Sequence, residues 1–496
     1  MIYIHSLGRA ARYYPQRTAL LKGGGPISFQ ALHERVKNIA AALAGHGFEA
    51  GERLALLLPN GPEYIEFVYA CSWLGLTAVP INTRLSSAEI DQILLDAKPH
   101  GLVRHSSLPK PEVQLPWQLV LDEESFDVSG SPCPDPIYDP EAIVALIYTS
   151  GTTGRPKGVV VTHANILANL DHLNYWIRFR EGGVYLHAAP IFHIADFPAM
   201  FAAPAFGARQ LAIPKFSAQD FCELVQREHV THTVLVPTML NLLTQFPEVK
   251  SYDLSSIEVL AYGGSPMAPA LVEQTRELLP NVKLVQAYGL SETGFLTGLQ
   301  DQDHIEGRLT SCGRPCPGVD LRIEDESGNE VEVGQHGELV ARGANVMRGY
   351  WNNPKETALA FRDGMFRTGD IGYQDADGYF YILDRLKDMI VTGGENVYSG
   401  EVEAVIYKHP AVREAAVFGI PDPKWGELVM ATVVLKPGMA LTSDELLSYC
   451  KQFLANYKIP RRIEFSDTEL PKSGSGKILK KILRERFWTK DERSVA

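Results

Sequence analysis

Helical and strand patterns alternate along the first half of this 496-residue chain, and this alternation constrains the fold more than any other feature. Ser28 stands before a helical pattern whose apolar residues recur at spacings of three and four as far as Leu43. Residues 53–58 then read as a buried strand, and residues 62–74 as a helix with proline in its first turn. Similar units continue to about residue 290. We therefore expect mostly parallel sheets that are covered by helices on both faces.

The pattern changes in the last third of the chain, where glycine-containing turns become frequent. Residues 319–323, 337–342 and 379–383 read as short strands, which is typical of a small antiparallel sheet. From Asp388 onward an α+β pattern begins, and its last long helix is expected at residues 443–457. This change of pattern indicates a second domain.

We place the domain boundary between residues 386 and 387. The expected fold class is α/β, with residues 1–386 forming a large N-terminal domain of mostly parallel, αβ-layered subdomains plus a small antiparallel β subdomain. Residues 387–496 are expected to form a mobile α+β C-terminal domain. A chain of this length exceeds one ordinary hydrophobic core, which agrees with at least two domains.

The composition argues against several classes of protein. Charged residues make up 21% of the chain and the formal net charge is −12, which disfavours nucleic acid as the main partner. No apolar run approaches the ~20 residues that a membrane-spanning helix needs, so an integral membrane protein is not expected. The cysteines are scattered, without the spacing of a zinc site or a disulfide framework. We expect a reduced, cytoplasmic protein, and a homodimer is compatible with these features.

One loop is rich in groups that bind anions. Residues 149–158 read Thr-Ser-Gly-Thr-Thr-Gly-Arg-Pro-Lys-Gly and join two expected strands, at 145–148 and 159–161. Glycines let backbone N–H groups close around an anion, hydroxyls add donors, and Arg155 and Lys157 supply positive charge. Because Lys157 is followed by glycine rather than by Ser or Thr, the loop is not a Walker A motif. We interpret it as a phosphate-binding loop, with a mobile polar hairpin as the alternative.

With this loop the chain resembles the adenylate-forming superfamily, which comprises acyl-CoA synthetases, firefly luciferases and nonribosomal-peptide adenylation domains. Further motifs of that family follow in its order, among them Ala-Tyr-Gly-Leu-Ser-Glu-Thr at 287–293 and Pro-Lys-Ser-Gly-Ser-Gly-Lys at 471–477. The other matching segments are 261–266, 367–370, 384–388 and 393–396. The acyl-CoA ligase branch resembles the chain best. The resemblance implies an enzyme that uses ATP and Mg²⁺ to convert a carboxylic acid into its acyl-adenylate, with release of pyrophosphate, and then forms the coenzyme A thioester, with release of AMP.

The resemblance also assigns roles to single residues. Glu292 is expected to hold Mg²⁺, and Lys477 to bridge the carboxylate and the α-phosphate; these two and His193 are the candidate catalytic residues. Tyr288 is expected to stack on adenine, and Asp370 to accept hydrogen bonds from the ribose hydroxyls. The ATP-binding residues that the resemblance implies are Thr149, Ser150, Gly151, Thr152, Thr153, Gly154, Lys157, Gly264, Ser265, Ala287, Tyr288, Gly289, Ser291, Asp370 and Arg385.

Two local expectations concern the backbone around these residues. We expect residues 284–287 to be a strand, and Tyr288 and the residues up to Thr293 to form the turn that follows it. We expect Ser265 near the start of a helix, with Pro266 at its first position.

In the family, the second step follows a rotation of the C-terminal domain, and the hinge is expected here at Lys387. Gly393, Gly394 and Glu395 would then line the passage for the pantetheine arm of coenzyme A. Where the family usually has proline after a tyrosine, this chain has Ser399. Four basic residues beyond Lys477 are expected on a solvated helix face, although they are also candidates for attracting a phosphate of coenzyme A: Lys480, Lys481, Arg484 and Arg486.

Residues 190–197 resemble the edge of the acyl pocket. His193 is typical of acyl- and aryl-CoA ligases, whereas Asp196 leaves an amino acid substrate open. Small apolar residues at 199–203 suit a neutral tail. We expect a fatty acid of medium or longer chain, with an aromatic acid of the cinnamate or benzoate type as the alternative. An enzyme that loads a carrier protein instead of free coenzyme A would carry the same motifs, as would a luciferase-like oxygenase. A non-catalytic nucleotide sensor is the remaining alternative.

Overall fold

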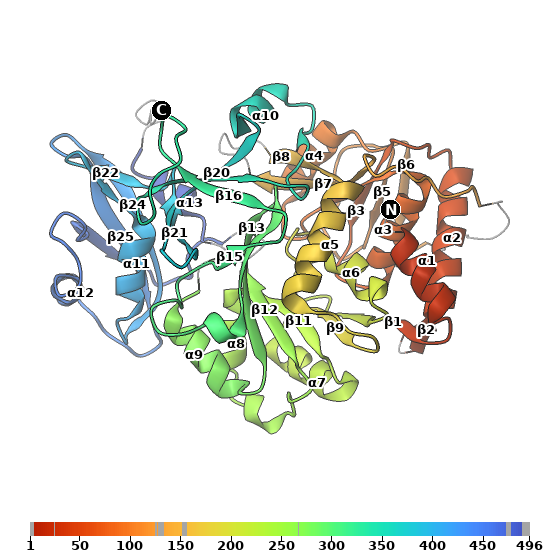
Figure 1. Cartoon of the computed structure of the whole chain (residues 1–496), viewed down its shortest axis with the longest axis horizontal. Helices are drawn as coiled ribbons and strands as arrows, with labels where there is room; N and C mark the ends of the chain where they lie inside the picture. Colours follow the sequence, from red (N-terminus) through yellow and green to blue (C-terminus); the bar gives the residue numbers. More distant parts are fainter. Residues whose placement is uncertain are drawn as a thin grey trace. The chain divides into compact units, whose positions relative to one another are not determined.

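The computed structural model describes residues 4–23, 25–124, 126, 133–150, 156–265, 267–472 and 478–488 (Figure 1). The chain divides into two compact units. The first comprises Met1–Leu309, Gly313–Asp320 and Ala341–Phe366, and the second comprises Thr310–Cys312, Leu321–Val340 and Arg367–Ala496. Among the described helices, none combines the length and the apolar character needed to cross a bilayer.

The larger sheet of the first unit has nine strands, in the order β15-β14-β13-β12-β11-β9-β10-β1-β2. The strands from β13 to β1 along this order run parallel to one another. Their carboxyl ends therefore lie at one edge of the sheet. The bounds are β1 (Thr18–Lys22), β2 (Gly25–Ser28), β9 (Val184–His187), β10 (Arg209–Ala212), β11 (His232–Leu235), β12 (Val259–Gly263), β13 (Lys283–Leu290), β14 (Gly294–Leu299) and β15 (Arg314–Pro315).

Alternation along these strands divides the apolar side chains between two cores. In β12, Leu260 and Tyr262 belong to a cluster formed with α7 (Ala218–Glu228), α8 (Pro237–Thr244) and α9 (Pro269–Leu278). The side chains of Val259 and Ala261 belong instead to the larger of the two cores. Helices α1 (Ile4–Tyr13) and α6 (Ala199–Ala205) contribute to this larger core. The sheet is thus buried on both faces, as the alternating pattern predicts.

The second sheet of this unit follows the order β18-β8-β7-β4-β3-β5-β6. Its neighbouring helices begin where the sequence predicts: Ser28 caps α2 by accepting a hydrogen bond from the N–H of Ala31, and α3 begins at Pro62. Helix α5 contacts strands of both sheets, β8 and β14. The bounds are β3 (Arg53–Leu57), β4 (Thr77–Pro80), β5 (Gly101–Arg104), β6 (Trp117–Val120), β7 (Ile143–Ser150), β8 (Pro156–Thr162), β18 (Gly349–Tyr350), α2 (Phe29–Gly45), α3 (Pro62–Leu74), α4 (Ser87–Ala97) and α5 (His163–Ile177).

The predicted antiparallel sheet has the order β16-β17-β20-β19, and β21 pairs with β20. A further sheet near the C-terminus has the order β23-β22-β25-β24, with β26 beside β25. The bounds are β16 (Asp320–Glu324), β17 (Gly337–Arg342), α10 (Pro354–Ala360), β19 (Phe361–Arg362), β20 (Met365–Gln374), β21 (Phe380–Arg385), β22 (Ile390–Thr392), β23 (Glu395–Val397), α11 (Ser399–Tyr407), β24 (Val412–Asp422), β25 (Gly426–Leu435), α12 (Ser443–Cys450), β26 (Arg462–Phe465) and α13 (Lys480–Arg484). The expected α/β class, with a large N-terminal part built on parallel sheets and a smaller C-terminal part, is confirmed. The boundary at residue 386 and the mobility of the C-terminal domain stay predictions.

Two predicted helix bounds are wrong. Helix α12 ends at Cys450 rather than at residue 457, because the N–H groups of Gln452 and Phe453 bond to carbonyls only three residues back, which replaces the four-residue spacing of the α-helix. Helix α9 begins at Pro269 rather than beside Ser265, since proline fits the first helical turn, where no N–H partner is needed. Pro266 lies outside the described residues.

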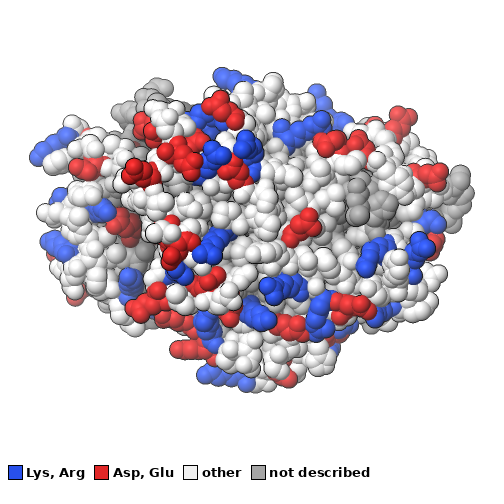
Figure 2. Space-filling view, in the orientation of Figure 1, with Lys and Arg blue, Asp and Glu red and all other residues white. Residues whose placement is uncertain are grey.

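The surface agrees with a modest negative charge. On the face that Figure 2 shows, acidic and basic side chains are interspersed, and the described residues there form no extended basic field. All six cysteines are free thiols, as their scattered positions predict.

Candidate active site

Several segments with predicted functional residues follow parallel strands of the nine-stranded sheet. The loop with His193 follows β9, Gly264 and Ser265 follow β12, and Ser291 and Glu292 follow β13. Since parallel strands end at the same edge, the topology brings these segments to one edge of the sheet. Ligands bind at this edge in open α/β sheets.

The strand β13 is longer than predicted. It continues through Tyr288 and Gly289 to Leu290, where Tyr288 pairs with Thr297 of β14 across a bulge. A Cβ atom at Gly289 would lie 1.7 Å from the carbonyl oxygen of Gly294. Close strand packing therefore requires this glycine, independently of any nucleotide. The expectation that the turn begins at Tyr288 is wrong; it begins at Ser291.

The candidate metal ligand Glu292 is held by the segment that ends at Tyr350. The Tyr350 hydroxyl donates a hydrogen bond of 2.9 Å to Oε1 of Glu292, and the N–H of Met347 donates one of 2.7 Å to its carbonyl. Burial and the neighbouring Glu292 carboxylate raise the pKa of Tyr350, so the phenol stays a donor. The Glu292 side chain and backbone are therefore held in a defined position.

Tyr350 also contacts the base of the phosphate loop. It pairs with Val159 in the β18–β8 ladder, and its ring lies 5.1 Å from Nζ of Lys157. Nζ of Lys157 forms an ion pair with Glu356 of α10. One tyrosine thus joins the candidate metal carboxylate to the lysine of the loop.

The tip of the phosphate loop lies outside the described residues. Strands β7 and β8 form an antiparallel hairpin in which Thr149 pairs with Lys157 and Ser150 with Pro156. The two strands are therefore longer than predicted: Thr149, Ser150, Pro156 and Lys157 belong to the paired hairpin, where the sequence placed them in the loop. Gly151, Thr152, Thr153 and Gly154 are not described, and neither is Lys477.

The residues of this cluster fit a magnesium–nucleotide ligand. A partly buried carboxylate with a fixed orientation is a suitable oxygen ligand for Mg²⁺, and a lysine beside it suits a phosphate. Gly264 has a φ of +79°, which favours glycine, and a Cβ atom there would meet Val236 only at 3.8 Å, so the turn leaves open space.

His193 lies in the loop after β9, where its Nδ1 accepts a hydrogen bond of 3.2 Å from the N–H of Ala195. Nδ1 is therefore unprotonated, and the ring proton is on Nε2. Burial lowers the pKa of His193, which keeps the imidazole neutral near pH 7.

Asp196, three residues further, belongs to an internal network. It is fully buried and accepts hydrogen bonds from the Tyr185 hydroxyl at 2.5 Å and from Nδ1 of His187 at 2.6 Å. Nε2 of His187 in turn contacts Oε1 of Gln210 at 2.9 Å. A carboxylate with these partners is not available to an ammonium group, which argues against an amino acid substrate.

A second group of predicted residues lies in the other unit. Asp370 and Arg385 are direct partners across β20 and β21, and Nε of Arg385 lies 2.6 Å from Oδ1 of Asp370. The side chain of Asp370 is only 3% exposed, so the guanidinium fixes the carboxylate that is expected to bind ribose. The resemblance implied both residues separately, and the structure places them in contact.

The predicted hinge and coenzyme A loop follow within the same unit. Lys387 is exposed, and the N–H groups of Asp388 and Met389 return to the Arg385 carbonyl in a tight turn. Gly393 and Gly394, with φ of +60° and +85°, form the turn of the β22–β23 hairpin. Two positive φ angles are typical of a type I′ turn, which favours glycine at both positions.

The expectation of a fully solvated basic helix face is wrong for two of the four residues. Nζ of Lys480 lies 2.8 Å from Glu403, and Arg484 lies 3.6 Å from Asp388, with both basic side chains at most 16% exposed. Helix α13 packs on β24, so side chains four residues apart turn inward together. Lys481 and Arg486 are about half exposed, as predicted.

Comparison with known proteins now decides the family. The AMP-binding enzyme profile matches residues 7–351, and the AMP-binding enzyme C-terminal domain profile matches residues 401–477. The chain belongs to the AMP-binding enzyme family. The family resemblance inferred from the motifs is thereby confirmed.

Relatives cover nearly the whole chain. A feruloyl-CoA synthase from Amycolatopsis sp is 38% identical over 97% of this chain and 98% of the relative. A fatty acid–[acyl-carrier-protein] ligase, ScoC, from Streptomyces coeruleorubidus is 36% identical over 98% and 96%. The structure of an O-succinylbenzoate coenzyme A synthetase from Bacillus subtilis, in complex with ATP and magnesium ion, matches with a TM-score of 0.87 at 34% identity, covering 96% of this chain and 98% of that chain. The chain is an enzyme of the adenylate-forming CoA ligase class.

Sequence reasoning missed Tyr350 and Glu356. Tyr350 belongs to a two-residue strand that is too short to show a periodic pattern, and Glu356 looks like an ordinary acidic residue in the first turn of a helix. Neither residue gives a signal until the fold brings it to Glu292 and Lys157.

Proposed function

We propose that this protein couples a carboxylic acid with an apolar tail to coenzyme A, in two steps through an acyl-adenylate. The observation that carries the proposal is the cluster in which Tyr350 joins Glu292 to Lys157. It combines a ligand for a divalent cation with a positive charge for a polyphosphate, beside the carboxyl ends of parallel strands.

The first step needs compensation of like charges. A carboxylate oxygen attacks the α-phosphorus of ATP, and the bond to the pyrophosphate group breaks. Glu292 would hold Mg²⁺, which supplies charge neutralisation when bound, and Lys157 with the loop at 149–158 would bind the outer phosphates. Asp370, fixed by Arg385, would bind the ribose, and Lys477 would bring a cation to the attacking carboxylate.

The second step is attack of the coenzyme A thiol on the acyl carbon, with AMP as leaving group. We propose that the C-terminal part turns about Lys387, so that Gly393, Gly394 and Glu395 replace Lys477 at the site. The type I′ turn presents little side-chain bulk, which suits a narrow passage for pantetheine.

For the acid we propose an aromatic acid of the hydroxycinnamate type as the first candidate. Support comes from the feruloyl-CoA synthase relative and from the neutral His193, together with the internal role of Asp196. A fatty acid of medium or longer chain, expected first from the sequence, is the second candidate, and the fatty acid–[acyl-carrier-protein] ligase relative supports it. That relative also supports a carrier protein as an alternative acceptor.

An acid-dependent ATP–pyrophosphate exchange assay tests the proposal. The panel contains ferulate, cinnamate, benzoate, octanoate, palmitate and phenylalanine, and mass spectrometry detects thioesters after addition of coenzyme A. We expect exchange and thioester formation with ferulate or cinnamate, weaker activity with fatty acids and none with phenylalanine. Release of ADP and phosphate, instead of AMP and pyrophosphate, would overturn the proposal.

A further inference from the structure

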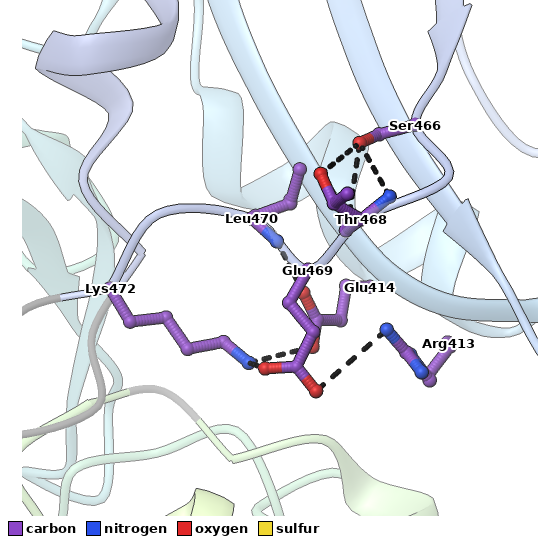
Figure 3. A network of polar contacts seen from close by, with 7 residues as sticks. All are labelled: Arg413, Glu414, Ser466, Thr468, Glu469, Leu470 and Lys472. Carbon is purple, nitrogen blue, oxygen red and sulfur yellow. Dashed lines mark hydrogen bonds and ion pairs between the residues drawn. The ribbon is translucent and has the colours of Figure 1, made fainter.

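A partly buried ion pair lies at the start of the segment that leads to Lys477. Nζ of Lys472 lies 2.7 Å from Oε1 of Glu414, a residue of β24, and Oε2 of the same glutamate accepts a hydrogen bond of 3.0 Å from the N–H of Leu470 (Figure 3). The side chain of Glu414 is 13% exposed, so solvent screens this pair less than a surface pair. One carboxylate therefore fixes both the backbone and a side chain of this segment.

A second acidic residue contacts Lys472 from the solvent side. Oε2 of Glu469 lies 3.3 Å from Nζ of Lys472, and Oε1 lies 3.9 Å from Arg413 (Figure 3). Glu469 is 67% exposed, so we assign it a minor share of the attraction. Glu414 is the principal partner.

The backbone closes the same segment into a narrow stem. Lys472 and Ile478 form an antiparallel bridge, and the N–H of Leu479 donates a hydrogen bond of 2.7 Å to the Pro471 carbonyl. Leu470 is 3% exposed in an apolar cluster with residues of β24, and Ile478 packs against that cluster. Both sides of the stem thus pack against the same apolar cluster, while residues 473–477 themselves are not described.

Beyond the stem, a second lysine–glutamate pair fixes helix α13. Nζ of Lys480 lies 2.8 Å from Glu403 and 2.5 Å from Oγ of Ser399. Burial alone would lower the pKa of Lys480, but the carboxylates of Glu403 and Asp384 outweigh it and raise the pKa, so the ammonium group stays charged. The chain on either side of residues 473–477 is therefore held by a lysine–glutamate pair, to β24 on one side and to α11 on the other.

We propose that Glu414 is a positioning residue for the adenylation step, because it holds the stem from which Lys477 extends. This inference rests on the proposed function of Lys477. A charge that must meet a transition state is sensitive to its position, and a displacement of about 1 Å costs up to ~100-fold in rate. Glu414 acts through Lys472 and Leu470 and touches neither substrate.

The two half-reactions separate a positioning role from a structural one. Lys477 is expected to serve only adenylation, so loss of the Glu414 anchor slows acyl-adenylate formation and leaves thioester formation from supplied acyl-adenylate intact. A general loss of folding would lower both rates.

The experiment compares Glu414→Ala, Glu414→Gln and Lys477→Ala in the full chain. We expect Glu414→Ala to reduce ATP–pyrophosphate exchange about 10- to 100-fold, and to leave the rate from supplied acyl-adenylate within about twofold. Glu414→Gln keeps an acceptor for the Leu470 N–H but loses the charge. We therefore expect its exchange rate to lie between the rates of wild type and Glu414→Ala. Glu464→Gln removes a carboxylate of β26 that pairs with Arg462 and Arg486 but not with the stem, and serves as the matched control with wild-type rates.

A double substitution tests whether Glu414 and Lys472 act on the exchange rate as one pair. Lys472→Met removes the same pair from its other side, so combining it with Glu414→Gln should add little further loss of exchange. Unchanged exchange in Glu414→Ala, or equal loss in both half-reactions at an unchanged melting temperature, would overturn the inference. If Glu414→Ala does not fold, the same criteria apply to Glu414→Gln. If the wild-type protein adenylates no acid, the proposed function itself fails, which is a distinct result.

Discussion

The hydroxyl of Tyr350 donates a hydrogen bond of 2.9 Å to the carboxylate of Glu292, although the two residues are 58 positions apart in the chain. The same ring lies 5.1 Å from Nζ of Lys157. A single side chain therefore sets the distance between a candidate metal ligand and a candidate phosphate ligand. This relationship makes Tyr350 the first target for testing the site.

Tyr350→Phe should weaken the binding of magnesium during adenylation. The substitution keeps the ring beside Lys157 but removes the donor to Glu292, and a hydrogen bond to a charged group is worth about 1.5–3 kcal/mol. We expect the Mg²⁺ concentration for half-maximal ATP–pyrophosphate exchange to rise about tenfold or more. Tyr381→Phe removes a 3.0 Å hydrogen bond to the Asp375 carboxylate elsewhere and should leave this concentration unchanged. Equal Mg²⁺ dependence of wild type and Tyr350→Phe would contradict the assignment of Glu292.

Glu356→Gln should improve the binding of ATP. In the structure Lys157 is paired with Glu356, and both side chains are less than one-third exposed. A phosphate must compete with that carboxylate for the lysine. Removing the charge of Glu356 should therefore lower the KM for ATP by roughly fivefold, equivalent to about 1 kcal/mol. Steady-state kinetics at saturating acid measure the change, and Glu258→Gln, which removes an exposed pair with Arg180, is the control. A rise in KM would instead show that Glu356 orients Lys157 for binding.

Stability should fall as the pH drops below 6.5, partly because of His232. Burial lowers the pKa of His232 to about 4 in the folded chain, whereas an unfolded histidine has a pKa near 6.5. Between these values the unfolded state binds more protons, so the free energy of unfolding decreases with falling pH, by up to about 1.4 kcal/mol per pH unit for this residue. Urea unfolding at pH 7.0, 6.0 and 5.0 measures the slope. His232→Gln should reduce that slope, and an identical slope would exclude His232 as a contributor.

Ser399→Pro, which restores the usual residue of the family, should destabilise the second unit. The N–H of Ser399 donates a hydrogen bond of 2.5 Å to the buried Asp384 carboxylate, and proline has no N–H. Ser399 is the first residue of α11, a position where proline fits sterically, so the change removes the N–H donor and the hydroxyl contact with Lys480 without a clash in the helix. We expect a loss of about 1–3 kcal/mol in the free energy of unfolding. Ser399→Ala keeps the N–H and loses only the contact with Lys480, so it should cost less; an equal cost would show that the hydroxyl dominates.

The sequence by itself determined the elements whose cause is local. The cap at Ser28 and the helix Pro62–Leu74 agree with the structure, because capping and proline geometry depend on neighbouring residues only. The α/β class and the family also followed from patterns and motifs along the chain. The helix end at Cys450, where the hydrogen-bond spacing changes, was predicted wrongly.

The tertiary structure alone decided which side chains meet. The pairing of Tyr350 with Glu292, the burial of Asp196 by Tyr185 and His187, and the inward turn of Lys480 join residues from separate elements. Desolvation and hydrogen bonding, which set the charge state and orientation of these groups, depend on neighbours distant in the chain. In the sequence, Asp196 therefore looks like a ligand for the substrate. In the fold it is an internal hydrogen-bond acceptor, because it is buried and accepts hydrogen bonds from two neighbouring side chains.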